Sequence, residues 1–277
     1  MAQSISPIGV FDSGVGGLTV LKQLIRFLPN ENFIYLGDTA RVPYGNKSAD
    51  TIKRYAREAT HFLLEKNVKM IVIACNTVSS LAINEVRQAA QGIDIVGMID
   101  FSAIAAYRTS RNKNIGIIGT RATISSKGYE EHLKFIAQKS PLKIKSIPCP
   151  LFVPLVEELQ INTDATKLIA KQYLEPFKEF GADTLILGCT HYPALKKVIN
   201  DLLPNVDLID TGEQSAIQVL RILAEKQLLN SSEIDFSQTP QIEFYLTDFS
   251  YSFTQLAELL LGFPIDNPKL IEFNKNL

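Results

Sequence analysis

Two short stretches of this chain decide its fold: Met70-Ile-Val-Ile-Ala-Cys-Asn-Thr77 and Thr184-Leu-Ile-Leu-Gly-Cys-Thr-His191. Each contains a short apolar run that has the length of a buried parallel strand. The cysteine after each run, Cys75 or Cys189, is then expected at the carboxyl edge of a sheet, where open α/β folds bind ligands. Two thiols that face one substrate from opposite sides suit a reaction that takes a proton from one face of a carbon and returns it to the other.

The composition describes a globular protein without a strong charge bias. The chain has 277 residues, enough for two domains of ordinary size or one large one. Hydrophobic residues make up 46% and charged residues 21%, and the net charge is −1. A general nucleic-acid surface or an anionic-membrane surface would need a basic excess, so no nucleic-acid partner is expected.

Targeting and metal-binding signals are missing from the sequence. No apolar run approaches the ~20 residues that span a bilayer, and the N-terminus lacks the charged start and apolar core of a secretory signal. The three cysteines and three histidines contain no CxxC, HxxxH or HExxH spacing, and Cys189 and His191 form the only close pair. We therefore expect a protein of the reducing cytoplasm that does not bind the membrane and has no metal site.

Strand-like and helix-like apolar patterns alternate along the chain. The expected strands cover Ile8–Phe11, Phe33–Leu36, Met70–Ala74, Ile93–Met98, Ile115–Ile118, Lys143–Ile147, Thr184–Leu187 and Val206–Ile209. The expected helices cover Leu18–Leu28, Ala49–Glu65, Ser79–Ala90, Thr123–Ala137, Asp164–Phe180, Ala194–Leu203, Glu213–Gln227 and Phe253–Leu261. Strands separated by helices predict an α/β fold with mainly parallel sheets, flanked by helices and joined by right-handed crossovers.

A faint internal repeat suggests two related halves. Ile8–Ser13 is similar to Ile115–Thr120, and the segments around Cys75 and Cys189 recur at a similar offset. A chance likeness of apolar strands is the alternative explanation. With the repeat, we expect two pseudo-symmetric domains with an active site in the cleft between them. The expected domains are residues 1–98 plus 209–277, with Cys75, and residues 99–208, with Cys189.

A glycine-rich loop, Asp12-Ser-Gly-Val-Gly-Gly17, follows the first expected strand and opens a helix. The sixth position of GxGxxG holds Thr19 and the Walker lysine is missing, which argues against a nucleotide loop. The glycines would let the backbone approach a small ligand, and free N–H groups at the helix start suit a carboxylate. Asp12 would hold a substrate ammonium or a proton, or would only cap the helix together with Ser13.

A second loop, Leu36–Gly45, leaves the next expected strand with turn-forming residues. Taken alone, it is an ordinary loop. Beside a ligand site, Tyr44 and the Gly45 amide would contact an anionic group.

The two thiols have a plain alternative, because cysteine is among the most buried residue types. The pair favours catalysis: Cys75 and Cys189 each precede a hydroxyl or amide residue at an expected helix start, and helix N-termini lower a thiol pKa below about 8.5. His191 lies two residues after Cys189 and would deliver or hold its proton. Cys149, between two prolines, has no such setting and is expected to be structural.

Five segments carry a specific resemblance to a known family. They are Ile8-Gly-Val-Phe-Asp-Ser-Gly-Val-Gly-Gly-Leu-Thr-Val-Leu21, Tyr35-Leu-Gly-Asp-Thr-Ala-Arg-Val-Pro-Tyr-Gly45, Ala74-Cys-Asn-Thr77, Cys149-Pro-Leu-Phe-Val-Pro-Leu-Val-Glu157 and Gly188-Cys-Thr-His-Tyr-Pro193. The chain resembles the cofactor-independent glutamate racemases of the aspartate/glutamate racemase superfamily. One departure is Ile99-Asp-Phe-Ser102, where such sequences usually read Ile-Glu-Pro-Gly; it concerns the local geometry of the crossing between the domains.

The resemblance implies two α/β domains that enclose glutamate in a buried cleft, without pyridoxal phosphate, metal or any other cofactor. It implies that Cys75 takes the α-proton from D-glutamate and Cys189 takes it from L-glutamate, while the opposite thiol supplies the new proton. The assisting groups would be Asp12 for Cys75, His191 for Cys189, and Glu157 as a further acid, with the adjacent Glu158 as an alternative to the last.

The resemblance also implies how the substrate is held and what the reaction supplies. The substrate-binding residues would be Asp12, Ser13, Pro43, Tyr44, Gly45, Asn76, Thr77, Thr120, Thr190 and His191. The product D-glutamate would serve bacterial peptidoglycan synthesis, and the usual assembly of the family is a homodimer.

Three other functions remain open at this point. An aspartate racemase, or another isomerase of the superfamily, would share the scaffold and act on a different substrate. A non-catalytic binding or regulatory protein would bind glutamate without exchanging its α-hydrogen. A thiol–disulfide oxidoreductase is disfavoured, because the cysteines are not arranged as CxxC.

Overall fold

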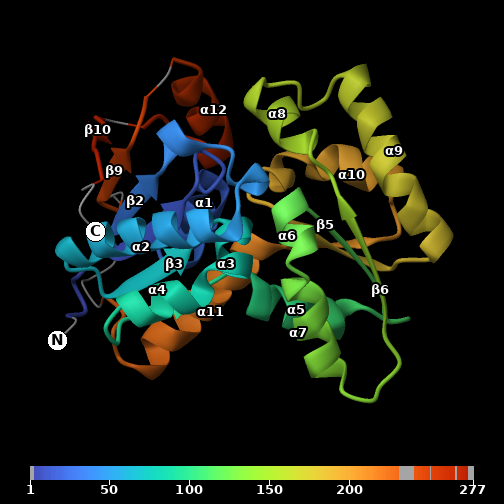
Figure 1. Ribbon diagram of the computed structural model, residues 1–277, viewed down its shortest axis with the longest axis horizontal. Helices are drawn as coiled ribbons and strands as arrows, with labels where there is room; N and C mark the ends of the chain where they lie inside the picture. The colour runs from blue at the N-terminus through green and yellow to red at the C-terminus, as the bar shows by residue number, and fades with distance from the viewer. Residues whose placement is uncertain (1–2, 231–239, 250, 266, 274–277) are drawn as a thin grey trace.

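The computed structural model describes residues 3–230, 240–249, 251–265 and 267–273. These residues form two parallel sheets flanked by helices, so the predicted α/β class is confirmed. Figure 1 shows the two sheets in different halves of the molecule, with helices packed around each. Among the helices of the described residues, none is both long and apolar enough to cross a bilayer.

The first sheet has six strands in the order β10-β9-β2-β1-β3-β4, and every pairing is parallel. The strands are β1 (Ile8–Asp12), β2 (Phe33–Gly37), β3 (Met70–Ile73), β4 (Asp94–Val96), β9 (Ile242–Leu246) and β10 (Lys269–Leu270). The helical segments of this part are α1 (Leu18–Phe27), η1 (Thr39–Arg41), η2 (Tyr44–Asn46), α2 (Ala49–Glu65), α3 (Asn76–Leu81), α4 (Ile83–Ala89), α11 (Thr211–Glu225) and α12 (Tyr251–Leu261). The core strands β1, β2 and β3 are buried along their whole length, which explains their continuous apolar runs.

The second sheet has four parallel strands in the order β6-β5-β7-β8. Its strands are β5 (Asn114–Gly119), β6 (Lys143–Pro148), β7 (Thr184–Gly188) and β8 (Asp207–Asp210). Its helical segments are α5 (Ile99–Thr109), α6 (Arg121–Ser125), α7 (Gly128–Ala137), α8 (Phe152–Glu157), α9 (Asp164–Phe180), η3 (Tyr192–Leu195) and α10 (Lys196–Leu202). The order repeats β2-β1-β3-β4 of the first sheet, so β3 and β7 occupy equivalent places. The two cysteines that the sequence singles out therefore end equivalent strands.

Two long helices have the bounds that the sequence predicts, because capping residues define their ends. Ser48 precedes α2 and its hydroxyl accepts a hydrogen bond from the Thr51 N–H, and Thr163 caps α9 in the same way through the Thr166 N–H. At the other end of α9, Gly181 adopts the left-handed conformation, with φ of 69°, that ends many helices.

Other elements differ from the prediction. The helix expected at 79–90 is two helices, α3 and α4, which meet at Ala82, and the one expected at 123–137 is α6 and α7, divided at the left-handed Lys127. Helix α5, which begins within the departing segment Ile99–Ser102, helix α8, and strands β9 and β10 were not predicted. Strand β9 pairs with β2 and α12 packs on α1, so the described C-terminal residues join the first sheet. The domain boundaries near 98 and 208 stay a prediction.

Asp183 ties the loop before β5 to the start of β7. Its carboxylate accepts hydrogen bonds from Ser110 Oγ at 2.6 Å, from the Arg111 and Asn112 N–H groups at 2.7 Å each, and from Thr184 Oγ1 at 3.0 Å. Burial raises the pKa of Asp183, but these hydrogen bonds outweigh burial and lower the pKa below its ordinary value. A carboxyl group of this kind stabilises the fold above its unfolded pKa of about 3.9, and the contribution is lost as the pH falls through the folded pKa.

We expect Asp183→Asn to lower the free energy of unfolding at pH 7 by about 2–3 kcal/mol, because an amide oxygen accepts weaker hydrogen bonds than a carboxylate. Urea denaturation would measure the loss, which should shrink as the pH falls below about 4. Asp207→Asn is the matched control: Asp207 pairs with Arg111 at 3.3 Å on the surface, so its removal should change stability by about 0.5 kcal/mol or less. Equal losses in the two variants would contradict the assignment.

Candidate active site

The carboxyl ends of the strands in both sheets carry the polar residues that the sequence singles out. In the first sheet, Asp12 ends β1 and Cys75 lies two residues after β3. In the second, Thr120 follows β5 and Cys189 follows β7. Because parallel strands end at one edge of their sheet, each sheet contributes a cluster of functional side chains.

A small cavity brings residues from both sheets together. Its volume is about 40 Å³, and its lining residues are Ser13, Val42, Pro43, Tyr44, Gly45, Cys75, Asn76, Thr77, Thr120, Val153, Glu157, Cys189, Thr190 and His191. Both thiols therefore face one space. Every residue that the resemblance implies lines this cavity except Asp12, which is fully buried. The roles of these residues stay predictions.

A second, larger cavity lies away from these residues. It has a volume of about 700 Å³, and its lining includes Lys69, just before β3, and Asp94, the first residue of β4. These residues lie at the amino ends of the strands, opposite to the edge that carries the cysteines. No sequence-predicted site residue lines it, so the candidate site is not the larger of these two cavities.

Cys75 lies at the N-cap position of α3, and its Sγ is 3.5 Å from the Ser13 hydroxyl. Burial and the negative charge of Asp12 raise the pKa of the Cys75 thiol to about 12. Hydrogen bonding with the Ser13 hydroxyl and with the Val78 N–H in α3 acts in the opposite direction, but it is weaker. The expectation that the helix start lowers this thiol pKa is therefore wrong for Cys75, and the group holds its proton in the free protein.

Cys189 has a different neighbour, the imidazole of His191. The Cys189 Sγ lies 3.9 Å from His191 Nδ1, and His191 Nε2 lies 3.0 Å from Glu157 Oε1. Burial alone would lower the pKa of His191, but the hydrogen bonds and charges of Cys189 and Glu157 raise it to about 10. His191 is thus positively charged at neutral pH, and its ring lies within reach of the Cys189 sulfur. Glu157 lines the cavity and contacts His191 whereas the adjacent Glu158 does not line it, so the geometry favours Glu157 over Glu158 as the partner of His191.

Asp12 is fully buried at the end of β1. Its Oδ2 accepts a hydrogen bond from the Gly14 N–H at 3.0 Å, while its Oδ1 has no hydrogen-bond partner among the described residues. Burial raises the pKa of Asp12 above its ordinary value, although the charge of His191 and the N–H groups of the glycine loop oppose this shift. An unpaired buried oxygen of this kind is suited to accept a proton or an ammonium group.

The glycine-rich loop packs closely against other residues of the site. A Cβ atom on Gly16 would lie 2.4 Å from Thr190 Oγ1 and 2.5 Å from the His191 ring, and one on Gly17 would lie 2.3 Å from Asp12 Cβ. The loop glycines therefore give room to the chain's own site residues. The N–H groups of Gly14 and Gly17 face the Asp12 carboxylate, and a carboxylate bound by this loop stays a prediction.

Hydroxyl and amide groups connect the two sides of the cavity. The Thr77 hydroxyl, on α3, lies 3.0 Å from the Thr120 hydroxyl, which caps α6. The Asn76 amide oxygen accepts a hydrogen bond of 2.6 Å from the Tyr129 hydroxyl on α7. Thr19 donates a hydrogen bond of 2.8 Å to the Thr190 carbonyl. Contacts between the halves thus fix the polar lining on both sides.

Comparison with known proteins places this site in a family. A family model described as Asp/Glu/Hydantoin racemase matches residues 8–218. The glutamate racemase of Chlorobaculum tepidum is 43% identical over 269 residues, which cover 97% of each chain. That of Chlorobaculum parvum is 44% identical over 270 residues, again 97% of each. The chain belongs to the glutamate racemase family.

Solved structures agree with this assignment of the racemase. The crystal structure of the Francisella tularensis glutamate racemase in complex with D-glutamate matches with a TM-score of 0.90 at 37% identity, and the match covers 97% of this chain and 98% of that one. A glutamate racemase from Bacillus anthracis matches with a TM-score of 0.90 at 36% identity over 98% of both chains. The racemase is therefore an amino-acid isomerase, with its cysteines on the scaffold of this family.

Two lining residues of the racemase were not predicted from its sequence. Val42 precedes Pro43 in the segment that the resemblance covers, and Val153 lies one helical turn before Glu157 on α8. The spacing of Val153 and Glu157 would have indicated a shared face had α8 been predicted. In the part of the racemase that the structure describes, no group of three or more His, Cys, Asp or Glu side chains is placed to hold a metal ion.

Proposed function

We propose that this racemase interconverts L- and D-glutamate by a two-base mechanism in which Cys75 and Cys189 exchange protons with the two faces of Cα. The observation that carries the proposal is that both thiols line one cavity, each at the end of an equivalent strand. The cavity, of about 40 Å³, is far smaller than the 300–1,000 Å³ of sites for drug-sized ligands, which argues against a large substrate. The Glu157–His191 contact supports a polarised pair at Cys189.

A two-base mechanism requires the two thiols to begin in opposite protonation states. Cys75 keeps its proton because its pKa is about 12, and we assign the role of the base for L-glutamate to Cys189, whose Sγ lies 3.9 Å from His191 Nδ1. Cys189 then removes the α-proton of L-glutamate: the C–H bond breaks and an S–H bond forms. The Cys75 thiol delivers its proton to the opposite face of Cα and becomes a thiolate. The protein left behind, with Cys189 protonated, is the form that acts on D-glutamate.

The cavity must also hold a substrate whose α-carbon gains negative charge. Preorganised donors and the exclusion of water supply the required stabilisation. We assign the carboxylates and the ammonium group to the polar lining from Ser13, Tyr44, Gly45, Asn76, Thr77, Thr120 and Thr190, with Asp12 accepting from the ammonium. The Tyr44 hydroxyl donates to Asp38, so the backbone of the Tyr44–Gly45 turn is the part left to contact a carboxylate.

The place of the reaction in the cell rests on the resemblance to the family. We propose that D-glutamate from this racemase enters peptidoglycan and that the protein works in the cytoplasm, which suits three free cysteines. The homodimer stays a prediction.

Proton NMR in D₂O tests the proposed reaction. With L-glutamate we expect loss of the Cα–H signal as solvent deuterium enters, together with accumulation of the D-isomer until the two enantiomers are equal. D-Aspartate, assayed in the same way, should exchange far more slowly. Exchange of aspartate in place of glutamate would assign the scaffold to the other substrate, and tight glutamate binding without exchange would indicate a non-catalytic protein.

A further inference from the structure

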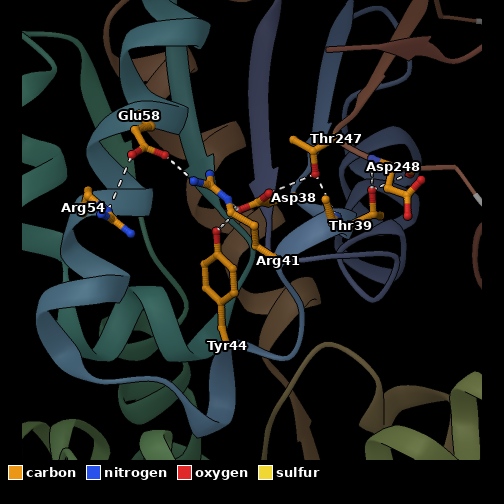
Figure 2. A network of polar contacts seen from close by, with 9 residues as sticks. Asp38, Thr39, Arg41, Tyr44, Arg54, Glu58, Thr247 and Asp248 are labelled. Carbon is orange, nitrogen blue, oxygen red and sulfur yellow. Dashed lines mark hydrogen bonds and ion pairs between the residues drawn. The ribbon is translucent and has the colours of Figure 1, made fainter. Parts of the chain in front are cut away.

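A polar network links the turn that lines the cavity to distant parts of the first half. Asp38, at the end of β2, is fully buried, and its carboxylate accepts hydrogen bonds from the Tyr44 hydroxyl, from Arg41 Nε at 2.7 Å and from Thr247 Oγ1 at 2.9 Å. Figure 2 shows the Arg41 side chain between Asp38 and the Glu58 carboxylate of α2. One guanidinium therefore bridges two carboxylates.

Arg41 is held on its faces as well as at its edge. Its guanidinium carbon lies 3.8 Å from the centre of the Tyr55 ring and 4.4 Å from the centre of the Phe273 ring. A planar guanidinium can stack on aromatic rings and donate to two carboxylates at once, and a lysine ammonium cannot. The geometry thus requires arginine at this position for more than its charge.

The turn itself has little structure of its own. Between Asp38 and Lys47 the backbone forms only the short turns η1 and η2, so side chains fix its path. The turn also packs closely against the other half of the molecule, since a Cβ atom on Gly45 would lie 2.9 Å from Thr120 Cβ. A shift of the turn by a fraction of an ångström would therefore change the shape of the cavity.

We infer that Arg41 is a positioning residue, which acts through Asp38 and the Tyr44 hydroxyl to hold the Pro43–Gly45 turn in the shape that binds the substrate. The inference deepens the proposed function and, as far as it concerns glutamate, rests on it. Arg41 does not line the cavity, so it would act on a bound substrate only through the turn. Its effect is on the position of backbone groups, so its loss should weaken binding of the substrate and its transition state alike.

The test compares Arg41→Lys and Tyr44→Phe with the wild-type protein. We expect each variant to raise KM for glutamate about tenfold while kcat changes by less than about twofold. The double variant should raise KM no further than the stronger single variant, because both substitutions break one chain of contacts.

Arg54→Lys is the matched control. Arg54 lies on α2, 3.8 Å from the same Glu58 carboxylate but largely exposed, and the kinetics of this variant should be those of the wild type. Circular dichroism checks that each variant is folded. If Arg41→Lys does not fold, Tyr44→Phe, which removes only one hydroxyl, still tests the inference.

A second readout does not depend on the substrate. Alkylation of Cys75 by iodoacetamide, followed by mass spectrometry, reports how well the turn closes the cavity. We expect severalfold faster alkylation in Arg41→Lys and Tyr44→Phe and no change in Arg54→Lys. Unchanged KM and unchanged alkylation would overturn the inference, as would additive effects in the double variant. Faster alkylation in a protein whose wild type does not exchange glutamate would refute the proposed function and still support the positioning role.

Discussion

Replacing either Cys75 or Cys189 with alanine should lower the rate of glutamate racemisation by about 10³-fold or more, because each removes one of the two groups that move the proton. Alanine leaves the backbone of the strand end in place and removes only a sulfur atom from the cavity lining. Cys149→Ala is the matched control. Cys149 is buried near Tyr192 and does not line the cavity, so its loss should affect stability and leave turnover unchanged.

The two single-thiol variants should differ in a way that turnover alone cannot reveal. The equilibrium constant between enantiomers is one, so kcat/KM must be equal in both directions for every variant. The exchange of the α-hydrogen with solvent, without inversion at Cα, can differ between the two enantiomers. Cys75→Ala keeps Cys189 and should exchange the α-hydrogen of L-glutamate with D₂O slowly, and Cys189→Ala should do so with D-glutamate. Full racemisation in either purified variant, or equal exchange of both enantiomers in each, would refute the two-thiol assignment.

The sequence predicts those parts of the fold that local patterns encode. The apolar runs that end at Cys75 and Cys189 indicate buried parallel strands, and they are found at equivalent places in the two sheets. The first residue of helix α2 could be predicted, because Ser48 is a strong N-cap residue. Strand β9 was not predicted, since its pairing with β2 joins residues about 200 positions apart and no local pattern records it.

Some features of the candidate site could likewise be predicted from local sequence, and others are set by packing. Its cysteines and its Asp12 could be named from the sequence because each follows a strand. The choice between Glu157 and Glu158 depends on which face of α8 meets His191, and that face is set by packing. The raised pKa of Cys75 could not be predicted either, because burial and the charge of Asp12 outweigh the helix start. The network around Arg41 depends on Thr247 and Phe273, which are distant in the sequence.

Gly16→Ala should lower kcat/KM by about 10²-fold or more, although Gly16 carries no functional group. Its backbone is not left-handed, so alanine adds no conformational strain there. The added Cβ would meet the His191 ring at 2.5 Å and Thr190 Oγ1 at 2.4 Å, and the ring must move away. That movement separates His191 from Glu157 and from Cys189, the two groups that raise its pKa to about 10. Steady-state kinetics of the purified variant would measure the loss.

The pH dependence separates this displacement from general destabilisation. In the wild type, kcat/KM should fall on the alkaline side as His191 loses its proton near pH 10. In Gly16→Ala the pKa of His191 should return toward its ordinary value of about 6.5, so activity is lost at a lower pH. Gly128→Ala is the matched control, because a Cβ atom there would meet no atom closer than 3.6 Å, and its pH profile should be that of the wild type. A Gly16→Ala protein that is less stable but keeps the wild-type alkaline limb would show that the loop does not set the position of His191.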